Sequence, residues 1–211
     1  MVCKRIFKLK KKLDEKSHKK VDIMVKNKIR PSTYLYPMPT TIVGANVKGK
    51  PNFVTIAFCG NLQYKPPMLV ISCGKLHYTT EGIKENQTFS VNIPSTKMVM
   101  VTDYVGTTSG RTTDKSQIFD VFYGELENAP MISEAPLNQE CKVVKIIDLG
   151  GHNDIIIGEI VQTYVNEECL TNRKPDIEKI DPIIFSGYSH YLNIGEVIAE
   201  AYKIGKEYKI E

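Results

Sequence analysis

Short apolar segments rich in β-branched residues, separated by proline and glycine, restrict the fold of this 211-residue chain more than any other feature. Residues 41–47 and 52–58 are two such segments, and Lys48-Gly49-Lys50 between them predicts the turn of a β-hairpin. Residues 140–148 and 155–165, which two glycines separate, predict a second hairpin. A chain with this pattern is expected to fold mainly into antiparallel strands.

The remaining segments predict further strands and a few short helices. The expected elements are strands at 68–73, 89–94 and 182–185, and helices at 78–86 and 95–106. A threonine near residue 79 is expected to cap the first helix, and Ser95 or Thr96 the second. Residues 194–208 mix helix and strand preferences and are left open. Six or so closely spaced strands with helical inserts indicate a mainly β domain, a closed or split antiparallel barrel, rather than a doubly wound sheet.

The charge distribution separates a basic N-terminal extension, residues 1–28, from a domain of residues 29–211. Residues 1–20 hold nine of the 28 Lys and Arg residues and two of the 24 acidic residues, so their net charge is +7 and that of the rest is −3. Ile6, Leu9 and Leu13 have helix-like spacing, which fits a short amphipathic helix or a solvated arm. An acidic domain gives little support to nucleic-acid binding.

Membrane insertion, secretion and metal binding find no support in the sequence. No apolar run approaches the roughly 20 residues of a membrane helix, and the first residues lack the apolar core of a secretory signal. A cytoplasmic location is therefore expected. The five cysteines form no CxxC pair and have no histidine at zinc-ligand spacing, so they are expected to be reduced thiols.

Several segments, read together, resemble the flavin reductase-like family and its flavoredoxin branch. The matching segments are Tyr36-Pro-Met-Pro-Thr-Thr-Ile-Val-Gly44 with 49–58 and Pro66-Pro67, Tyr78-Thr79-Thr80 with 89–94, Gly106-Thr-Thr-Ser-Gly-Arg-Thr-Thr-Asp-Lys115, and Gly151-His152-Asn-Asp with 157–160. Each is weak alone, but the combination is specific and covers about residues 36–195. The basic extension lies outside it.

This resemblance implies a six-stranded antiparallel Greek-key split barrel that binds FMN and assembles as a homodimer. It implies two alternative activities, namely electron transfer with retained FMN and a redox protein partner, or NAD(P)H:flavin oxidoreductase activity. NADH or NADPH would be the electron donor in the second case. Since no dinucleotide-binding fingerprint is present, a nicotinamide would bind in an open cleft over the flavin.

FMN carries a phosphate dianion, a polyol and a planar ring, so its site needs hydroxyls, free amides and one or two cations. By resemblance and by this chemistry, the predicted FMN-binding residues are Asn52, Thr55, Ile56, Ala57, Phe58, Cys59, Gly60, Asn61, Thr79, Thr80, Asn92, Ser109, Gly110, Arg111, Lys115, His152 and Tyr191. Lys115 is the preferred cation and Arg111 the second choice. Helical N–H groups beside Thr79 and Thr80 would attract the phosphate. No side chain is expected to act as catalytic acid or base.

Each of these residues also has an ordinary structural interpretation. Lys115 and Arg111 fit a solvent-exposed loop, and one threonine of the 78–80 segment can serve only as a helix cap. Phe58 fits core packing as well as a flavin contact, and it departs from the tryptophan that many relatives have there. His152 suits a strand-joining turn, and Tyr191 suits packing at the C-terminus or a dimer interface. The alternative function is a non-catalytic small β-barrel that binds nucleic acid or another anionic ligand.

Overall fold

The structure is a computed structural model, and it describes residues 26–187 and 189–210. The chain divides into two units, 1–33 and 34–211. Residues 26–33 of the first unit are exposed and have no regular secondary structure. The predicted amphipathic helix within residues 1–20 lies outside the described residues, and the domain boundary at residues 28 and 29 stays a prediction.

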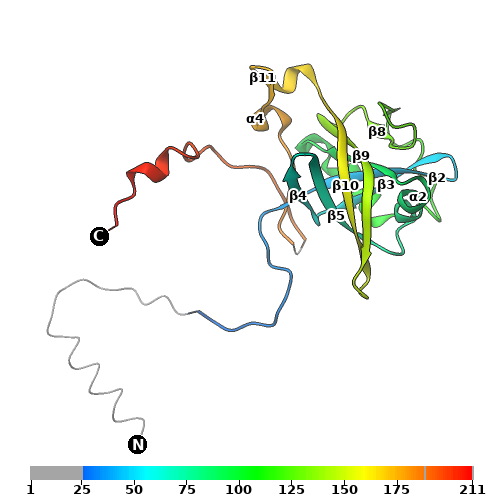
Figure 1. The fold of residues 1–211 in the computed structure, drawn as a ribbon, viewed down its shortest axis with the longest axis horizontal. Helices are drawn as coiled ribbons and strands as arrows, with labels where there is room; N and C mark the ends of the chain where they lie inside the picture. The colour runs from blue at the N-terminus through cyan, green and yellow to red at the C-terminus, as the bar shows by residue number, and fades with distance from the viewer. Residues whose placement is uncertain (1–25, 188, 211) are drawn as a thin grey trace, which may run out of the picture. The chain divides into compact units, whose positions relative to one another are not determined.

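The second unit is built mainly from β-strands (Figure 1). The strands are β1 (Met38–Pro39), β2 (Thr41–Val47), β3 (Lys50–Ile56), β4 (Cys59–Tyr64), β5 (Pro67–Gly74), β6 (Thr88–Ile93), β7 (Val121–Phe122), β8 (Met131–Ile132), β9 (Leu137–Asp148), β10 (Asn153–Val165), β11 (Leu170–Thr171), β12 (Lys174–Pro175), β13 (Ile184–Phe185) and β14 (Tyr191–Leu192). The helices are α2 (Tyr78–Asn86), α3 (Val99–Thr107) and α4 (Ile177–Ile180), with 3₁₀ turns η1 (Thr96–Met98), η2 (Glu167–Cys169) and η3 (Ile204–Glu207).

Seven strands form one antiparallel sheet in the order β3-β2-β6-β9-β10-β5-β4. The sheet curls so that β3 also contacts β5, which gives a barrel. Both predicted hairpins are confirmed, and the first turns through Lys48 and Gly49, both with positive φ. This conformation matches the twist of two strands joined by a two-residue loop. This sheet has one strand more than the six expected for the barrel, because residues 59–64 pair with β5 as an edge strand.

The β2–β3 hairpin lies between two hydrophobic clusters, because successive side chains of a strand point to opposite faces. Val43 and Val54 face the interior cluster of the barrel, which also contains Phe89 and Ile156. Their neighbours Ile42 and Phe53 face a second cluster formed with α3 and residues 118–135. Both faces of β3 are therefore covered at its centre, and α3 lies along its outer face.

The expected helix caps are wrong. His77 occupies the N-cap position of α2 without a side-chain cap bond, while the hydroxyls of Thr79 and Thr80 bond elsewhere in the buried interior. The predicted helix 95–106 is divided into η1 and α3, and neither Ser95 nor Met98, their N-cap residues, makes a side-chain cap bond. Thr96 bonds Asp181 instead. Tertiary hydrogen bonds thus replace the local ones that the sequence favoured.

Among the described residues, no helix combines the length and the apolar character required to cross a bilayer. The four described cysteines, Cys59, Cys73, Cys141 and Cys169, are free thiols as expected. Burial raises the pKa of Cys59 and of Cys73 to about 11, so both are protonated at neutral pH. They therefore act as small apolar residues of the barrel.

Candidate functional site

A groove follows the outer side of β3, and we call it the β3–α3 groove. It consists of three adjoining pockets of about 370, 210 and 200 Å³. Asn52, Tyr78, Gly110 and Lys115 line both the first and the second pocket. Gly106 is shared by the second and the third. The largest pocket falls within the range of about 300–1,000 Å³ typical of small-molecule sites.

The centre of the groove is held by a hydrogen bond between two buried polar side chains. The Asn52 amide on β3 donates to the Thr79 hydroxyl on α2 over 2.7 Å. Gly110 packs directly against this pair, since a Cβ atom on it would lie 2.1 Å from Asn52 Oδ1. Only a residue without a side chain allows this approach. The bond fixes the N-terminal turn of α2, whose N–H groups favour an anion, against the barrel edge.

Lys115 supplies a buried positive charge to the groove. Its side chain is 3% exposed, and its ammonium donates to the carbonyls of Phe53 and Val105 over 3.0 and 2.8 Å. Burial lowers the pKa of Lys115 to about 8. Among the residues that the structure describes, no carboxylate lies within ion-pair distance of it. An ammonium has three N–H donors, so one remains to bind an anionic ligand.

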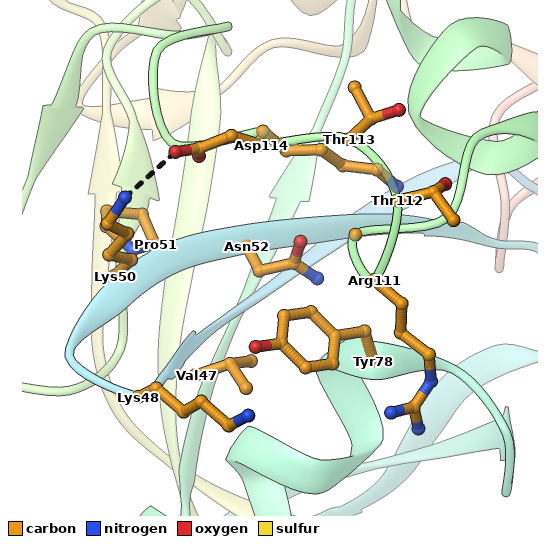
Figure 2. Close-up of a pocket in the computed structure, with 12 residues that line it drawn as sticks. Val47, Lys48, Lys50, Pro51, Asn52, Tyr78, Arg111, Thr112, Thr113 and Asp114 are labelled. Carbon is orange, nitrogen blue, oxygen red and sulfur yellow. Dashed lines mark hydrogen bonds and ion pairs between the residues drawn. The ribbon is translucent and has the colours of Figure 1, made fainter.

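Two cations at the rim of the first pocket, Arg111 and Lys50, are already paired. Arg111 bonds Glu81 and lies over the Tyr78 ring, with its guanidinium carbon 5.3 Å from the ring centre. Lys50 bonds Asp114 over 2.9 Å, as Figure 2 shows. Hydrogen bonds from Ser116 and Lys50 lower the pKa of Asp114. These exposed pairs contribute little to stability, but they keep the rim groups near the pocket.

The other end of the groove is aromatic. The third pocket is lined by Thr55 of β3, by Ala57 just after this strand, and by Phe185 and Tyr191. The Tyr191 hydroxyl donates to Asp103 over 2.9 Å, and its ring lies 5.7 Å from that of Phe185. Burial and the bond to Asp103 raise the pKa of Tyr191 to about 12, so the phenol stays neutral. The groove therefore has a cationic end and an aromatic end, and Asp103 also lines the aromatic end.

The structure brings nine of the predicted residues to the groove, namely Asn52, Thr55, Ala57, Thr79, Ser109, Gly110, Arg111, Lys115 and Tyr191. Three others lie in the interior: Ile56 in the barrel core, Thr80 bonded to the Gly74 carbonyl, and Asn92 bonded to the Ile42 carbonyl. Their side chains are committed to holding the fold. Their role as FMN ligands stays a prediction.

The last five predicted residues lie outside the groove. Phe58 lies between β3 and β4, where it is 42% exposed rather than packed in the core, and Cys59, Gly60 and Asn61 are the first residues of β4. Asn61 lines a separate hollow on the barrel surface. His152 lies at the tip of the β9–β10 hairpin, where its carbonyl accepts a hydrogen bond from the Lys75 amide.

Several groove residues were absent from the sequence prediction, and two of them, His77 and Tyr78, lie beside predicted ones. His77 and Tyr78 line the second pocket at the start of α2. Burial, and then the charge of Lys115, lower the pKa of His77, so its imidazole is neutral at pH 7. The adjacent Thr79-Thr80 motif marks this helix start, but no local pattern indicates that the histidine before it faces the same space. Its ring lies over Gly74, where it occupies room that a side chain would fill.

Comparisons with known proteins place this chain in a family. Residues 33–193 match the family model described as the flavin reductase like domain, so the chain belongs to the flavin reductase-like family. A flavoredoxin structure from Methanosarcina acetivorans is 45% identical, with a TM-score of 0.84 over 87% of this chain and 98% of that one. Flavoredoxin of Desulfovibrio vulgaris (Miyazaki F) is 34% identical, with a TM-score of 0.79 over 86% and 100%.

Two further similarities agree with this assignment. An uncharacterized protein of Archaeoglobus fulgidus is 32% identical over 146 residues, which are 68% of this chain and 81% of that protein. A putative flavin reductase with a split barrel domain from Shewanella frigidimarina is 19% identical, with a TM-score of 0.69 over 79% and 87%, and it supports the fold alone. The expected split barrel is confirmed, and the comparisons support a flavoprotein with a flavin as the class of cofactor.

Proposed function

We propose that this protein binds FMN in the β3–α3 groove. The observation that carries the proposal is the buried Lys115 ammonium, which has neutral carbonyl partners and borders a groove with an aromatic far end. A ligand with an anionic end and a planar aromatic end matches this arrangement. Flavoredoxin relatives at 45% and 34% identity support a flavin as that ligand.

The polarity of the groove sets the direction of the ligand. The phosphate would lie beside Lys115 and the N-terminal turn of α2, where Asn52 and Thr79 are already fixed by their hydrogen bond. The ring would lie toward Thr55, Ala57 and Tyr191. Gly110 would keep the 109–115 loop close enough to close over the polyol. These residues bind and orient, and none needs to transfer a proton.

Bound FMN would supply two-electron redox chemistry, while the protein supplies position and electrostatics. The Lys115 charge borders the first and second pockets and would favour an anionic ligand there. Burial makes this attraction stronger than it would be in water. We propose that the electrons pass either to a protein partner, as in a flavoredoxin-like carrier, or from NADH or NADPH to flavin, as in a reductase. The carrier reading is favoured by the two flavoredoxin relatives.

The proposal has two direct tests. Freshly purified protein, or protein incubated with micromolar FMN, should show flavin absorption bands near ~370 and ~450 nm, since the cofactor brings its own chromophore. A colourless protein that takes up no FMN would contradict the proposal. Oxidation of NADH or NADPH is then followed with and without added flavin. Turnover above the free-flavin background identifies a reductase, and its absence with FMN retained identifies a carrier.

We also propose a homodimer, as the family resemblance implies, and a cytoplasmic location. The test of assembly is mass by sedimentation or light scattering at several protein concentrations. A mass equal to that of one 23.8 kDa chain would contradict the homodimer without affecting FMN binding.

A further inference from the structure

The last part of the chain is apolar yet buries nothing in the protomer. Residues 195–210 are exposed without interruption. This stretch, which we call the C-terminal arm, carries six exposed large apolar side chains: Val197 70%, Ile198 98%, Tyr202 96%, Ile204 53%, Tyr208 80% and Ile210 92%. Single exposed apolar residues are ordinary, but six of them on one short segment mark an interaction surface.

A matching surface lies on the barrel, away from the β3–α3 groove. A hollow of about 260 Å³ is lined by Asn61, Leu62, Gln63, Tyr64, Pro67, Met68 and Ile160. Leu62 is 50% and Tyr64 94% exposed, and both belong to β4. In the described sheet, β4 is a terminal strand that pairs with β5 alone, so its other edge has unpaired main-chain groups. We call this surface the β4 hollow.

From these two surfaces we infer that the C-terminal arm of one copy docks in the β4 hollow of a second copy, and that the two copies exchange arms. Both surfaces are exposed in the same chain, and a twofold assembly uses each of them twice. The charges permit this contact, because the arm has three lysines and three glutamates and the residues lining the hollow carry no formal charge. Docking of an arm in a hollow therefore brings no net like charges together.

The available area is sufficient for a stable dimer. Tyr202 and Tyr208 are almost fully exposed, and a buried aromatic side chain removes roughly 150–250 Å² from water. Two exchanged arms would thus bury roughly 600–1,000 Å² through their tyrosines alone. Four aliphatic side chains on each arm and the lining of each hollow add to this. A standard protein interface buries about 1,600 Å² in total.

Between Tyr202 and Ile210 the arm also suits a strand. Tyr202, Ile204, Tyr208 and Ile210 all occupy even positions, and the odd positions between them hold polar residues or glycine. In the protomer residues 204–207 form the 3₁₀ turn η3, so docking as a strand requires this turn to unwind. Side chains of a strand alternate between its faces, so an extended arm would present these four residues, with Lys206, on one face. Such a segment can add to an exposed sheet edge, where main-chain hydrogen bonds provide affinity. The free edge of β4 offers this to the second copy.

This inference rests on the proposed homodimer but not on FMN binding, and its test uses the full-length chain. The arm variant is Ile198→Ser with Tyr202→Ser and Tyr208→Ser. The matched control is Glu196→Ser with Lys206→Ser and Lys209→Ser, on the same segment. All six side chains are exposed in the protomer, so neither variant should alter its fold, which circular dichroism checks. We expect the dimer dissociation constant to rise at least ~100-fold for the arm variant and less than ~3-fold for the control.

A second variant tests the receiving surface. Leu62→Ser with Tyr64→Ser should weaken the dimer as the arm variant does. An equimolar mixture of this hollow variant and the arm variant should form a heterodimer, because one intact arm then meets one intact hollow. Native mass spectrometry with a mass-tagged copy detects it.

Each contrary result is distinct. A dimer that persists in the arm variant overturns the inference and leaves the homodimer intact. A wild-type chain of single mass overturns both. Loss of the dimer in the arm variant but not in the hollow variant overturns the β4 hollow as the docking site. In every case the flavin spectrum reports FMN binding separately.

Discussion

Two regions matched to the family by sequence differ greatly in how the structure holds them. At the centre of the β3–α3 groove, Asn52 and Lys115 are 4% and 3% exposed and make hydrogen bonds across different elements. At the tip of the β9–β10 hairpin, Gly151 and His152 are exposed, and a side chain added at Gly151 would meet no atom within 4 Å. The comparison indicates that the groove is preorganised for a ligand and the hairpin tip is not.

The largest effect is expected from filling the groove at Gly110. In Gly110→Val, the new Cβ would lie 2.1 Å from Asn52 Oδ1, so the 109–115 loop must move away from β3. We expect FMN affinity to fall by roughly 100-fold, because a displacement of about 1 Å has effects of this size at positioned sites. Overpacking should also lower the free energy of unfolding by about 1–3 kcal/mol. Fluorescence titration with FMN and urea denaturation measure the two effects.

Gly151→Val at the hairpin tip is the matched control. It adds the same side chain where space is open, so the free energy of unfolding should change by less than about 0.5 kcal/mol. FMN affinity should stay within threefold of wild type, that is, about 0.7 kcal/mol. Equal losses of affinity in the two glycine variants would show that the hairpin tip is as constrained as the groove.

The next largest effect is expected at Lys115. Lys115→Gln removes the charge and keeps an N–H donor for the Phe53 or Val105 carbonyl. Hydrogen bonds to charged groups contribute about 1.5–3 kcal/mol, so FMN affinity should fall by roughly 10- to 100-fold. His152→Gln is the hairpin counterpart and should change affinity by less than threefold, about 0.7 kcal/mol. If His152→Gln weakens FMN binding as much as Lys115→Gln does, the hairpin tip contributes to FMN binding as much as the groove.

Lys115 also predicts the pH dependence of binding. Burial lowers the pKa of its ammonium to about 8 in the unliganded protein, and a bound phosphate would raise it again. FMN affinity should therefore be constant below about pH 8 and decrease as the pH rises through that value, because binding then requires uptake of a proton. Titrations between pH 6.5 and ~9.5 should show this decrease in wild type and not in Lys115→Gln. A decrease of equal size in both would assign the titration to another group.

Much of the fold was predictable from the sequence, because strand patterning is local. The β2–β3 and β9–β10 hairpins follow from period-two apolar segments with glycine between them. Residues 59–64 were missed as a strand because β4 is an exposed edge strand whose polar residues need no buried face. The cap predictions failed for a different reason: Thr79 and Thr96 have tertiary partners, Asn52 and Asp181, that local sequence cannot reveal.

The candidate site was less predictable, because it depends on which loops converge. Lys115 looked equally suited to an exposed loop, and only the fold shows its ammonium buried against the Phe53 carbonyl, 62 positions away in the chain. Asn92 is the opposite case. Its polar type and its place in a family motif suggested a ligand contact, whereas its side chain bonds the Ile42 carbonyl in the interior. A buried polar residue requires partners, and those partners can be the fold itself.

A moderate effect on stability is expected at the polar pair of the groove. Asn52→Ala removes the 2.7 Å hydrogen bond and leaves the buried Thr79 hydroxyl without this donor, so unfolding should become easier by about 1–3 kcal/mol. The hairpin counterpart is Asn153→Ala, which removes a part-buried bond of 3.0 Å to Ser72. It should cost about 0.5–1.5 kcal/mol. Urea denaturation midpoints at constant m-value provide the comparison, and a larger loss in Asn153→Ala would reverse it.

The smallest difference is expected between two exposed ion pairs, Arg111 with Glu81 at the groove rim and Lys75 with Asp148 near the hairpin. Solvent screens both, so Arg111→Gln and Lys75→Gln should each change the free energy of unfolding by less than about 1 kcal/mol. Their effects on FMN should still differ. Arg111 lines the first pocket and Lys75 does not, so Arg111→Gln should weaken FMN binding by a few-fold at low salt. At ~0.5 M salt the Arg111 charge is screened, so the FMN affinities of wild type and Arg111→Gln should become nearly equal. Equal affinities of the two variants at low salt would mean that the Arg111 charge plays no part in attracting the phosphate.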